Sequence, residues 1–335
     1  MTIGITKRAL IFGVGGQDGA HLARLLIGKG YEVHGTSRDV EVAAFDGLKQ
    51  LSIFSQVRLH SANLNEFRSV IQVLRDVAPA EIYNLSAQSS VGLSFDQPIE
   101  TVNSIVDATL NVMEAIRFLG GAQRFYNASS SEMFGDTGTT PASETTPFRP
   151  RSPYGVSKAA AHWMVDNYRK AYGLYACSGI LFNHESPLRK ERFVTQKIIR
   201  AAVDIYLGGT RPLQLGNIAV ARDWGWAPDY VEAMWLMLQQ PTPEDFVIAT
   251  GQAFTLEDFA KEAFQRLRLD WRRSVVSDPM LRRPYEIDYS VGNAAKAAKY
   301  LGWRASHAMP EVVARLIEAE LQRRRTFDKQ HVVTL

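Results

Sequence analysis

The sequence has little cysteine, little net charge and no long apolar run. The single cysteine, Cys177, excludes an intramolecular disulfide and favours a reducing compartment. The formal charge of +3 is too small to indicate a nucleic-acid partner. No apolar stretch approaches the roughly 20 residues of a membrane span, and no signal-peptide segment precedes the first expected strand. We therefore expect a cytoplasmic protein without a nucleic-acid or membrane partner.

Short apolar strands alternate with helical patterns through the first half of the chain. We expect strands at 8–12, 32–36, 57–60, 81–85, 124–128 and 175–182, and helices after 19, at 66–77, at 102–118 and around Tyr154. This alternation predicts an α/β fold with a Rossmann-like, doubly wound parallel sheet whose ligands lie at the carboxyl ends of its strands. Cys177 falls inside an expected buried strand, so we interpret it as an inert core thiol.

The alternation weakens after Asn183. Helices are expected at 193–207, 229–239, 256–267 and 310–324, with a short strand at 213–215. With 335 residues and 46% hydrophobic content, the chain can bury a large core divided between two lobes. The predicted nucleotide-binding domain spans 1–183 and receives 218–250. A smaller C-terminal α/β lobe, comprising 184–217 and 251–335, is expected to bind the substrate.

A glycine-rich turn follows the first strand, with glycines at 13, 16 and 19. A strand, a glycine turn and a helix in this order form the context of a dinucleotide-binding fingerprint. Gly13 permits the tight turn, Gly16 lets the backbone approach a pyrophosphate, and Gly19 allows the helix to pack closely on the strand. The N-terminus of the following helix would face the anion.

Four residues indicate acid–base chemistry: Ser130, Glu132, Tyr154 and Lys158. Tyr154 and Lys158 stand at i and i+4, which places them on one face of a helix. A neighbouring cation favours phenolate, so we expect the pKa of Tyr154 to lie below its ordinary value of roughly 10. Ser130 and Glu132 follow the strand at 124–128 and add a hydroxyl and a second acid–base group. The set suits redox chemistry combined with proton transfer.

The motifs, taken in order, resemble those of extended short-chain dehydrogenases/reductases, and most closely those of the GDP-mannose 4,6-dehydratase family, nearly end to end. Besides the glycine turn, they are Leu85-Ser86-Ala87-Gln88-Ser89, Pro150-Arg151-Ser152-Pro153-Tyr154-Gly155, Phe182-Asn183-His184-Glu185-Ser186-Pro187 and Arg222-Asp223-Trp224-Gly225. The last two segments are far more specific than the glycine turn. They distinguish this family from epimerases that share the fold.

The resemblance implies that GDP-mannose becomes GDP-4-keto-6-deoxymannose plus water, by internal hydride transfer through bound NADP. Tyr154 would take the proton of the 4-hydroxyl, Lys158 would hold the nicotinamide ribose, and Glu132 would remove the proton on carbon 5. The family has threonine where this chain has Ser130. The hydroxyl is retained, but serine is rotationally looser than β-branched threonine, which affects the expected rate rather than the type of reaction.

The resemblance also implies the binding positions, and no metal ion. For the cofactor they are Gly13, Gly16, Gln17, Asp18, Gly19, Arg38, Asn63, Leu64, Leu85, Ser86, Ala87, Gln88, Tyr154, Lys158, His184 and Arg189. For the GDP-sugar they are Ser89, Ser131, Asn183, Arg222 and Arg283. The arginines suit a diphosphate, because a guanidinium offers paired donors to its oxygens.

Two departures from the family pattern affect cofactor binding. The family usually has paired arginines and serines after its second strand, where they grip the 2′-phosphate of NADP and join subunits. This chain has Arg38, which favours a 2′-phosphate, followed by Asp39, which stands where an acid would bind the ribose of NAD. We expect NADP, and a homo-dimer or homo-tetramer. Asn63 replaces a family aspartate and keeps an acceptor for adenine.

Other functions stay open at this point. A nucleotide-sugar epimerase or 4-reductase needs Tyr154 and Lys158 but no carboxylate at 132. A UDP-glucuronate decarboxylase can share the Ser-Glu pair but has no need of the two specific C-terminal motifs. The substrate could also be another GDP-hexose or a GDP-heptose. A non-catalytic NADP-sensing protein is expected to lose Tyr154, Lys158 or Glu132, and this chain keeps all three.

Overall fold

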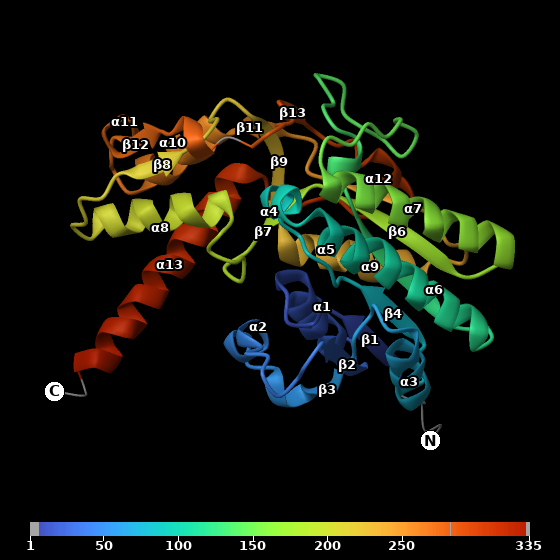
Figure 1. Cartoon of the computed structure of the whole chain (residues 1–335). Helices are drawn as coiled ribbons and strands as arrows, with labels where there is room; N and C mark the ends of the chain where they lie inside the picture. The colour runs from blue at the N-terminus through green and yellow to red at the C-terminus, as the bar shows by residue number, and fades with distance from the viewer. Residues whose placement is uncertain (1–6, 282, 333–335) are drawn as a thin grey trace.

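The computed structural model describes residues 7–281 and 283–332, and its main element is the predicted parallel sheet (Figure 1). Within these residues the sheet has seven strands in the order β10-β6-β5-β4-β1-β2-β3, and every neighbouring pair is parallel. The strands are β1 (Arg8–Phe12), β2 (Glu32–Ser37), β3 (Val57–Ser61), β4 (Glu81–Asn84), β5 (Arg124–Ser130), β6 (Ala176–Leu181) and β10 (Phe246–Ile248). The predicted doubly wound α/β fold is therefore confirmed.

The two faces of the sheet bury two separate cores, as the alternation of side chains along β1 requires. Ala9 and Ile11 pack with α1 (Gln17–Gly28), α2 (Asp46–Gln50) and α9 (Ala227–Gln239). Leu10 and Phe12 point to the opposite face, which is covered by α3 (Phe67–Val77), α6 (Ala108–Phe118) and α7 (Pro153–Tyr172). Since helices cover both faces, the central strand β1 is apolar and fully buried from Ala9 to Phe12.

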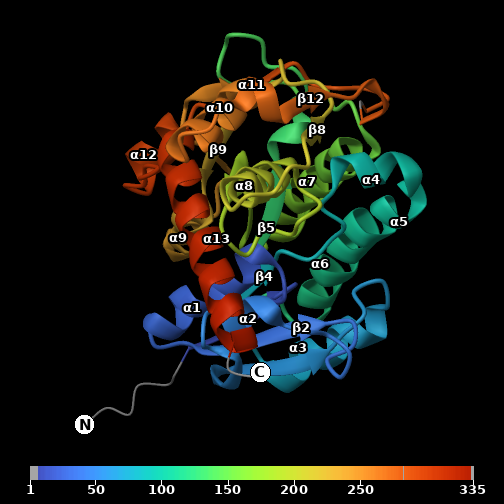
Figure 2. The same ribbon diagram turned by 90° about the vertical axis from the view of Figure 1, so that its left-hand side faces the viewer.

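A smaller lobe contains a second sheet, at the upper left of Figure 1. Its strands are β7 (Asn183–Glu185), β9 (Ala221–Trp226), β11 (Ala253–Thr255) and β13 (Tyr289–Ser290), with a separate pair β8 (Leu213–Leu215) and β12 (Val275–Ser277). The helices α8 (Val194–Tyr206), α10 (Leu256–Arg266) and α13 (Met309–Val332) pack against one another here, and Figure 2 shows α13 running past α8. The core of this lobe includes Ile198, Trp224, Phe259 and Val312.

The segment after β9 returns the chain to the main sheet. Helix α9 packs against α1, and β10 pairs with β6 at the sheet edge, where α12 (Ala295–Tyr300) contacts it. The buried Asp223 of β9 accepts hydrogen bonds from the backbone N–H groups of Thr250 and Gly251. This carboxylate therefore ties the second sheet to the loop that follows β10. The domain limits given above stay predictions.

Several elements differ from those expected from the sequence. The helix expected at 102–118 begins at Pro98 as α5 (Pro98–Val102), continues through a π-helical segment at Asn103–Asp107, and only then becomes α6. The final helix extends beyond 324 to Val332. Short elements missing from the sequence-based expectation include α4 (Val91–Asp96), α11 (Trp271–Ser274) and the small-lobe strands β7, β11, β12 and β13, whereas the short strand expected at 213–215 is present as β8. No helix in the described part of the chain is long and apolar enough to cross a bilayer.

Candidate active site

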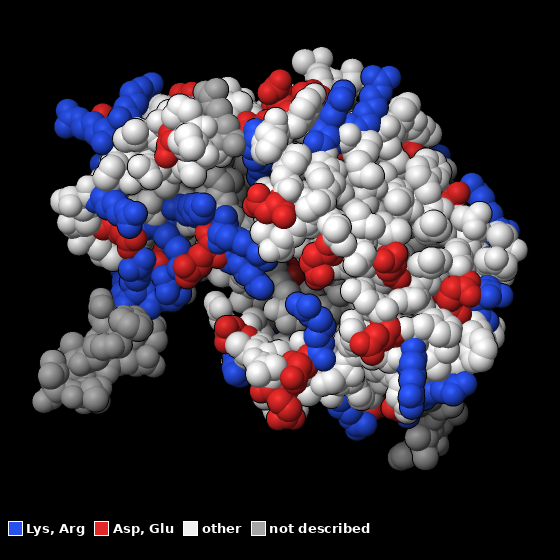
Figure 3. All heavy atoms as spheres, in the orientation of Figure 1, with Lys and Arg blue, Asp and Glu red and all other residues white. Residues whose placement is uncertain are grey.

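A cavity of about 1020 Å³ opens at the carboxyl ends of β1 to β4, where a doubly wound sheet places its ligands. Figure 3 shows the surface hollowed between the two lobes, with Lys and Arg side chains at its margin. Most of the predicted cofactor residues line this cavity: Gly13, Gly16, Gln17, Asp18, Gly19, Arg38, Asn63, Leu64, Leu85, Ser86, Ala87, Gln88 and Arg189. The exposed Ser89, predicted for the substrate, also lines it.

The glycine turn leaves room for a phosphate at the start of α1. Gly13 has φ +84, and a Cβ there would lie 2.9 Å from the backbone of Ser86. A Cβ on Gly19 would lie 2.4 Å from the carbonyl oxygen of Gly13, so only glycine lets the helix begin this close to the strand. The N-terminus of α1 therefore borders the cavity, where the pyrophosphate of a dinucleotide would bind.

Polar side chains tie the start of α1 to the loop after β7. His184 donates from Nδ1 to the carbonyl oxygen of Phe182 at 2.7 Å, and its Nε2 lies 2.9 Å from Oδ2 of Asp18. Gln17 donates to the carbonyl oxygen of His184 at 3.2 Å and accepts from the hydroxyl of Ser186 at 3.0 Å. Both predicted cofactor segments, the glycine turn and the His-Glu-Ser-Pro loop, therefore belong to one hydrogen-bonded unit.

Electrostatics within this unit favour an ion pair. Burial opposes charge on both partners, but the Asp18 carboxylate raises the pKa of His184 above its ordinary value. In return, His184, Gln17 and Arg189 outweigh the burial of Asp18 and lower the pKa of its carboxyl group. A protonated His184 and an ionised Asp18 thus hold the loop against α1.

His21, one turn further along α1, is a buried histidine whose protonation is expected to lower the stability of the folded protein at acid pH. Its side chain is 5% exposed, and neither ring nitrogen has a hydrogen-bond partner among the described residues. Burial, aided by Arg24, lowers the pKa of His21 to about 4. A histidine in the unfolded chain has a pKa near 6.5, so the unfolded state binds more protons between these two values, and stability is lost as the pH falls through that range.

We therefore expect His21 to contribute a loss of about 2 kcal/mol in unfolding free energy between about pH 7 and about pH 5. His21→Phe removes this titration, so the variant should lose that much less stability over the same interval. Urea unfolding of both proteins at the two pH values measures the difference. Equal losses in wild type and variant would show that His21 does not titrate in this way.

The four predicted catalytic residues come from the end of β5, the turn that follows it and the start of α7. Ser130 ends β5, Glu132 lies in the single turn at Ser131–Met133, and Tyr154 and Lys158 lie in the first turns of α7. Ser130 makes a hydrogen bond with Tyr154, and its Oγ accepts from the N–H of Glu132 at 3.3 Å. The ammonium of Lys158 lies 5.7 Å from the ring centroid of Tyr154. The structure thus brings the whole set together.

Helix α7 begins in a way that holds these residues against one another. The hydroxyl of Ser152 accepts from the N–H of Gly155 at 3.0 Å, and Pro153 occupies the first turn, where its missing N–H costs nothing. A Cβ on Gly155 would lie 2.8 Å from the carbonyl oxygen of Glu132. The absence of a side chain at 155 therefore lets the turn carrying Glu132 lie directly on the helix carrying Tyr154.

The expected lowering of the pKa of Tyr154 is wrong for this arrangement of the protein. Burial raises the pKa of Tyr154 to about 12, and the hydrogen bond from Ser130 offsets only part of that effect. Lys158 does not counter it: its ammonium donates to the carbonyl oxygen of Ala128 at 2.7 Å and lies 5.7 Å from the centroid of the Tyr154 ring. Burial also lowers the pKa of Lys158 to about 8.

Predicted substrate residues approach the catalytic set from the small lobe. Arg222 is buried in β9, and its guanidinium interacts electrostatically with Glu132 and with the exposed Arg283. Burial lowers the pKa of Arg222, against the attraction of Glu132. Ser131 is buried in the turn that carries Glu132, and Asn183 begins β7 beside β9. Arg222 therefore brings a positive charge into the electrostatic reach of Glu132, and Arg283 lies within reach of Arg222.

Some of the residues singled out in the sequence pack in the core or bond to their own loop rather than face the site. Trp224 is 2% exposed and packs on Phe259 with ring centroids 5.2 Å apart, as expected for a core aromatic. The amide of Gln88 donates to the carbonyl oxygen of Ser90 and to Thr101, so only part of this predicted cofactor residue faces the cavity. Cys177 is fully buried, and burial raises the pKa of its thiol, which confirms an inert core thiol.

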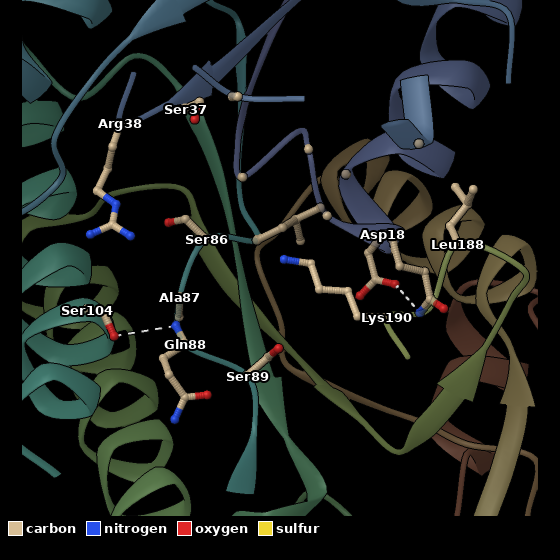
Figure 4. A pocket seen from close by; sticks show the side chains of 18 of the residues that line it. Asp18, Ser37, Arg38, Ser86, Ala87, Gln88, Ser89, Ser104, Leu188 and Lys190 are labelled. Atoms are coloured by element: carbon tan, nitrogen blue, oxygen red, sulfur yellow. Dashed lines mark hydrogen bonds between the residues drawn. The ribbon is translucent and has the colours of Figure 1, made fainter. Parts of the chain in front are cut away.

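Sequence reasoning missed several residues of the cavity wall. Figure 4 shows Ser37, Ser104, Leu188 and Lys190 around the cavity with the predicted residues. Ser104 lies in the π-helical segment and accepts from the N–H of Gln88 at 3.4 Å. No local pattern marks it, because its position depends on how that helix packs. Lys190 directly follows Arg189, and its positive charge was the one feature in the sequence that could have marked it as part of the cavity wall.

The fold and this site define an extended short-chain dehydrogenase/reductase that acts on nucleotide sugars. Residues 10–316 match the protein family described as GDP-mannose 4,6 dehydratase. GDP-mannose 4,6 dehydratase 2 of Arabidopsis thaliana is 45% identical over 94% of this chain and 87% of its own length. The human GDP-mannose 4,6 dehydratase is 41% identical over 95% and 92%. The chain belongs to the GDP-mannose 4,6-dehydratase family.

Solved structures share the fold at lower identity. A dTDP-glucose 4,6-dehydratase from Bacillus anthracis in complex with NAD superposes with a TM-score of 0.82 at 18% identity, covering 95% of this chain and 97% of that one. RMD from Pseudomonas aeruginosa, complexed with NADPH, has a TM-score of 0.78 at 22% identity, covering 95% and 98%. These likenesses show the architecture; the first of these structures was solved with NAD and the second with NADPH.

Proposed function

We propose that this chain converts GDP-mannose into GDP-4-keto-6-deoxymannose and water through a bound NADP that is not consumed. The observation that carries the proposal is the assembly of Ser130, Glu132, Tyr154 and Lys158 at the end of β5 and the start of α7. An epimerase or a reductase has no use for the carboxylate at 132. Family membership, over nearly the full length of the chain, supports the same reaction.

Each residue has a role that its surroundings support. When bound, the nicotinamide supplies a hydride acceptor at carbon 4 of the sugar and returns the hydride at carbon 6. Tyr154 takes the proton of the 4-hydroxyl, with Ser130 hydrogen-bonded to both the phenol and the substrate oxygen. Lys158 holds the ribose and keeps a positive charge near the phenol. The positive charge of an oxidised nicotinamide bound near Tyr154 would also favour the phenolate.

Glu132 carries the elimination. Once carbon 4 is a ketone, the hydrogen on carbon 5 is acidic, and Glu132 removes it as a proton. The protonated Glu132 gives this proton to the hydroxyl on carbon 6, which leaves as water while a double bond forms between carbons 5 and 6. When carbon 6 receives the hydride, carbon 5 regains a proton, which balances the one that Tyr154 took from the 4-hydroxyl. Arg222 and Arg283 bind the diphosphate of the substrate, for which their paired donors are suited. Asn183, Ser89 and Ser131 complete the polar contacts to the GDP-sugar.

We expect the purified protein to dehydrate GDP-mannose without net consumption of added NADPH, because the hydride leaves and returns within one turnover. Mass spectrometry of the sugar nucleotide and absorbance of the cofactor measure the two quantities together. A product of unchanged mass would indicate an epimerase. Stoichiometric loss of NADPH would indicate a reductase, and no turnover would favour a sensor.

We infer that NADP, rather than NAD, is the cofactor, because Arg38 extends into the cavity after β2 and no hydrogen bond or ion pair occupies its guanidinium within residues 7–281 and 283–332 (Figure 4). Asp39 is held in a local turn, where its carboxylate accepts from the N–H of Glu41 at 2.9 Å. It is therefore engaged with its own loop rather than directed at a ribose.

Arg38→Ala should weaken NADP binding by about 1–3 kcal/mol, the range of a hydrogen bond to a charged group, and barely change NAD binding. Titration of the purified chain with both dinucleotides provides the comparison. An equal loss for both cofactors would assign Arg38 a structural role.

A homo-dimer or homo-tetramer and a cytoplasmic location stay predictions. Light scattering of the purified chain measures the first directly.

A further inference from the structure

The loop from Pro187 to Phe193 forms a basic wall of the cavity. It contributes Arg189, Lys190 and Arg192, and Arg200 follows in α8. Three of these four cations already have partners. Arg189 lies 3.6 Å from Glu185 and 3.7 Å from the ring centroid of Phe193, Arg192 also lies over Phe193, and Arg200 pairs with Glu191.

Lys190 differs from its neighbours in having an uncommitted ammonium. Its only hydrogen bond to the described part of the chain is made by its backbone carbonyl, which accepts from the N–H of Phe193 at 3.1 Å. Figure 4 shows its side chain extended into the cavity, with the amine directed away from Asp18 and toward the side where Ser86 lies. A flexible lysine that reaches into a cavity without a carboxylate partner is available to an anionic ligand.

The anchoring of the loop indicates which part of a dinucleotide this ammonium would meet. Ser186 binds Gln17 at 3.0 Å, and the N–H groups of Leu188 and Arg189 bind back to Ser186. The loop is therefore fixed to the N-terminus of α1, where the pyrophosphate of a dinucleotide sits. Arg38, by contrast, follows β2, the position that faces the adenosine ribose and its 2′ substituent.

We propose that Lys190 binds the pyrophosphate of the cofactor from the side opposite the glycine turn and so closes the cationic wall over it. This role rests on the proposed use of a nicotinamide dinucleotide, and it is independent of the dehydration step. It divides the recognition of NADP between two cations: Arg38 discriminates NADP from NAD, whereas Lys190 binds a group that both dinucleotides contain. The sequence after the second strand offers a single arginine, and Lys190 supplies a second free positive charge from the other wall.

Lys190→Met tests this division, since methionine keeps the unbranched stem and removes the charge. We expect the variant to bind NADP and NAD about 5- to 20-fold more weakly than wild type, by the same factor for both, as for the loss of one partly exposed charge-assisted contact. Binding of adenosine 2′-monophosphate, which lacks the pyrophosphate, should be unchanged. Raising the salt concentration should narrow the gap between wild type and variant, because salt screens an exposed charge.

Lys197→Met is the matched control, because Lys197 is exposed on α8 and does not line the cavity. It should bind all three ligands like wild type. Calorimetric titration of the full chain, freed of nucleotide, gives every affinity needed.

A loss of affinity for NADP alone in Lys190→Met would overturn the proposal by assigning Lys190 to the 2′-phosphate. Unchanged affinities, or a loss equal to that of Lys197→Met, would overturn it as well. A wild-type chain that binds neither dinucleotide would instead contradict the proposed cofactor use itself.

Discussion

Replacing Glu132 by glutamine should lower the rate of dehydration by roughly 10²–10⁴-fold, the usual contribution of a positioned acid or base. Glutamine keeps the size and hydrogen bonding of the side chain but cannot accept the proton from carbon 5. Oxidation at carbon 4 depends on Tyr154 and Lys158 and should survive. Reduced-cofactor absorbance should therefore appear when the variant is mixed with GDP-mannose, and it should persist because the hydride has no acceptor at carbon 6.

Glu132→Asp serves as the companion variant, because it retains a carboxylate on a shorter stem. It should recover part of the dehydration rate, whereas a merely structural role for Glu132 would leave glutamine, the closer match in size, as the better replacement. Dehydration by Glu132→Gln at nearly the wild-type rate would show that Glu132 is not the elimination base. The carboxylate at position 132 would then no longer favour a dehydratase over an epimerase.

Removing the phenolic hydroxyl should instead stop both halves of the reaction. In Tyr154→Phe the proton of the 4-hydroxyl has no acceptor. The ketone at carbon 4 therefore cannot form, and the later elimination of water, which needs that ketone, cannot occur. We expect dehydration to fall by at least the roughly 10²–10⁴-fold of a lost general base, with no persistent reduced-cofactor absorbance. That absence distinguishes Tyr154→Phe from Glu132→Gln, although both variants lack product.

Tyr172→Phe is a matched control for this variant. Tyr172 ends the same helix and is 51% exposed, far along α7 from the catalytic turn. It should leave both steps unchanged. If Tyr154→Phe still accumulated reduced cofactor on mixing with GDP-mannose, another group would have to accept the first proton.

The sequence sufficed for the features that depend on local pattern. The strand, glycine turn and helix at 8–28 could be predicted because their spacing is set by backbone geometry, and Gly13 and Gly19 meet the close contacts that this geometry demands. The i, i+4 pair on α7, the hydroxyl that ends β5 and the carboxylate in the following turn were predictable for the same reason. Each of these motifs is contained in one or two consecutive elements.

Features that depend on tertiary packing were not predictable. The pKa of Tyr154 follows from its burial, which raises it to about 12, and the i, i+4 spacing carries no information on how deeply the phenol lies. The strands of the small lobe have three residues or fewer apart from β9, so their pairing is set by distant partners rather than by periodicity. The direction of Lys190 depends on the hydrogen bonds that fix its loop to Gln17.

The central claim is that one active site oxidises carbon 4, eliminates water across carbons 5 and 6, and returns the same hydride to carbon 6. The most direct test is incubation of the purified chain with GDP-mannose that carries deuterium on carbon 4, followed by mass spectrometry and NMR of the sugar nucleotide. We expect a product that has lost one water and keeps the deuterium, now on carbon 6. A dehydrated product without the label, or a labelled product that has lost no water, would contradict it.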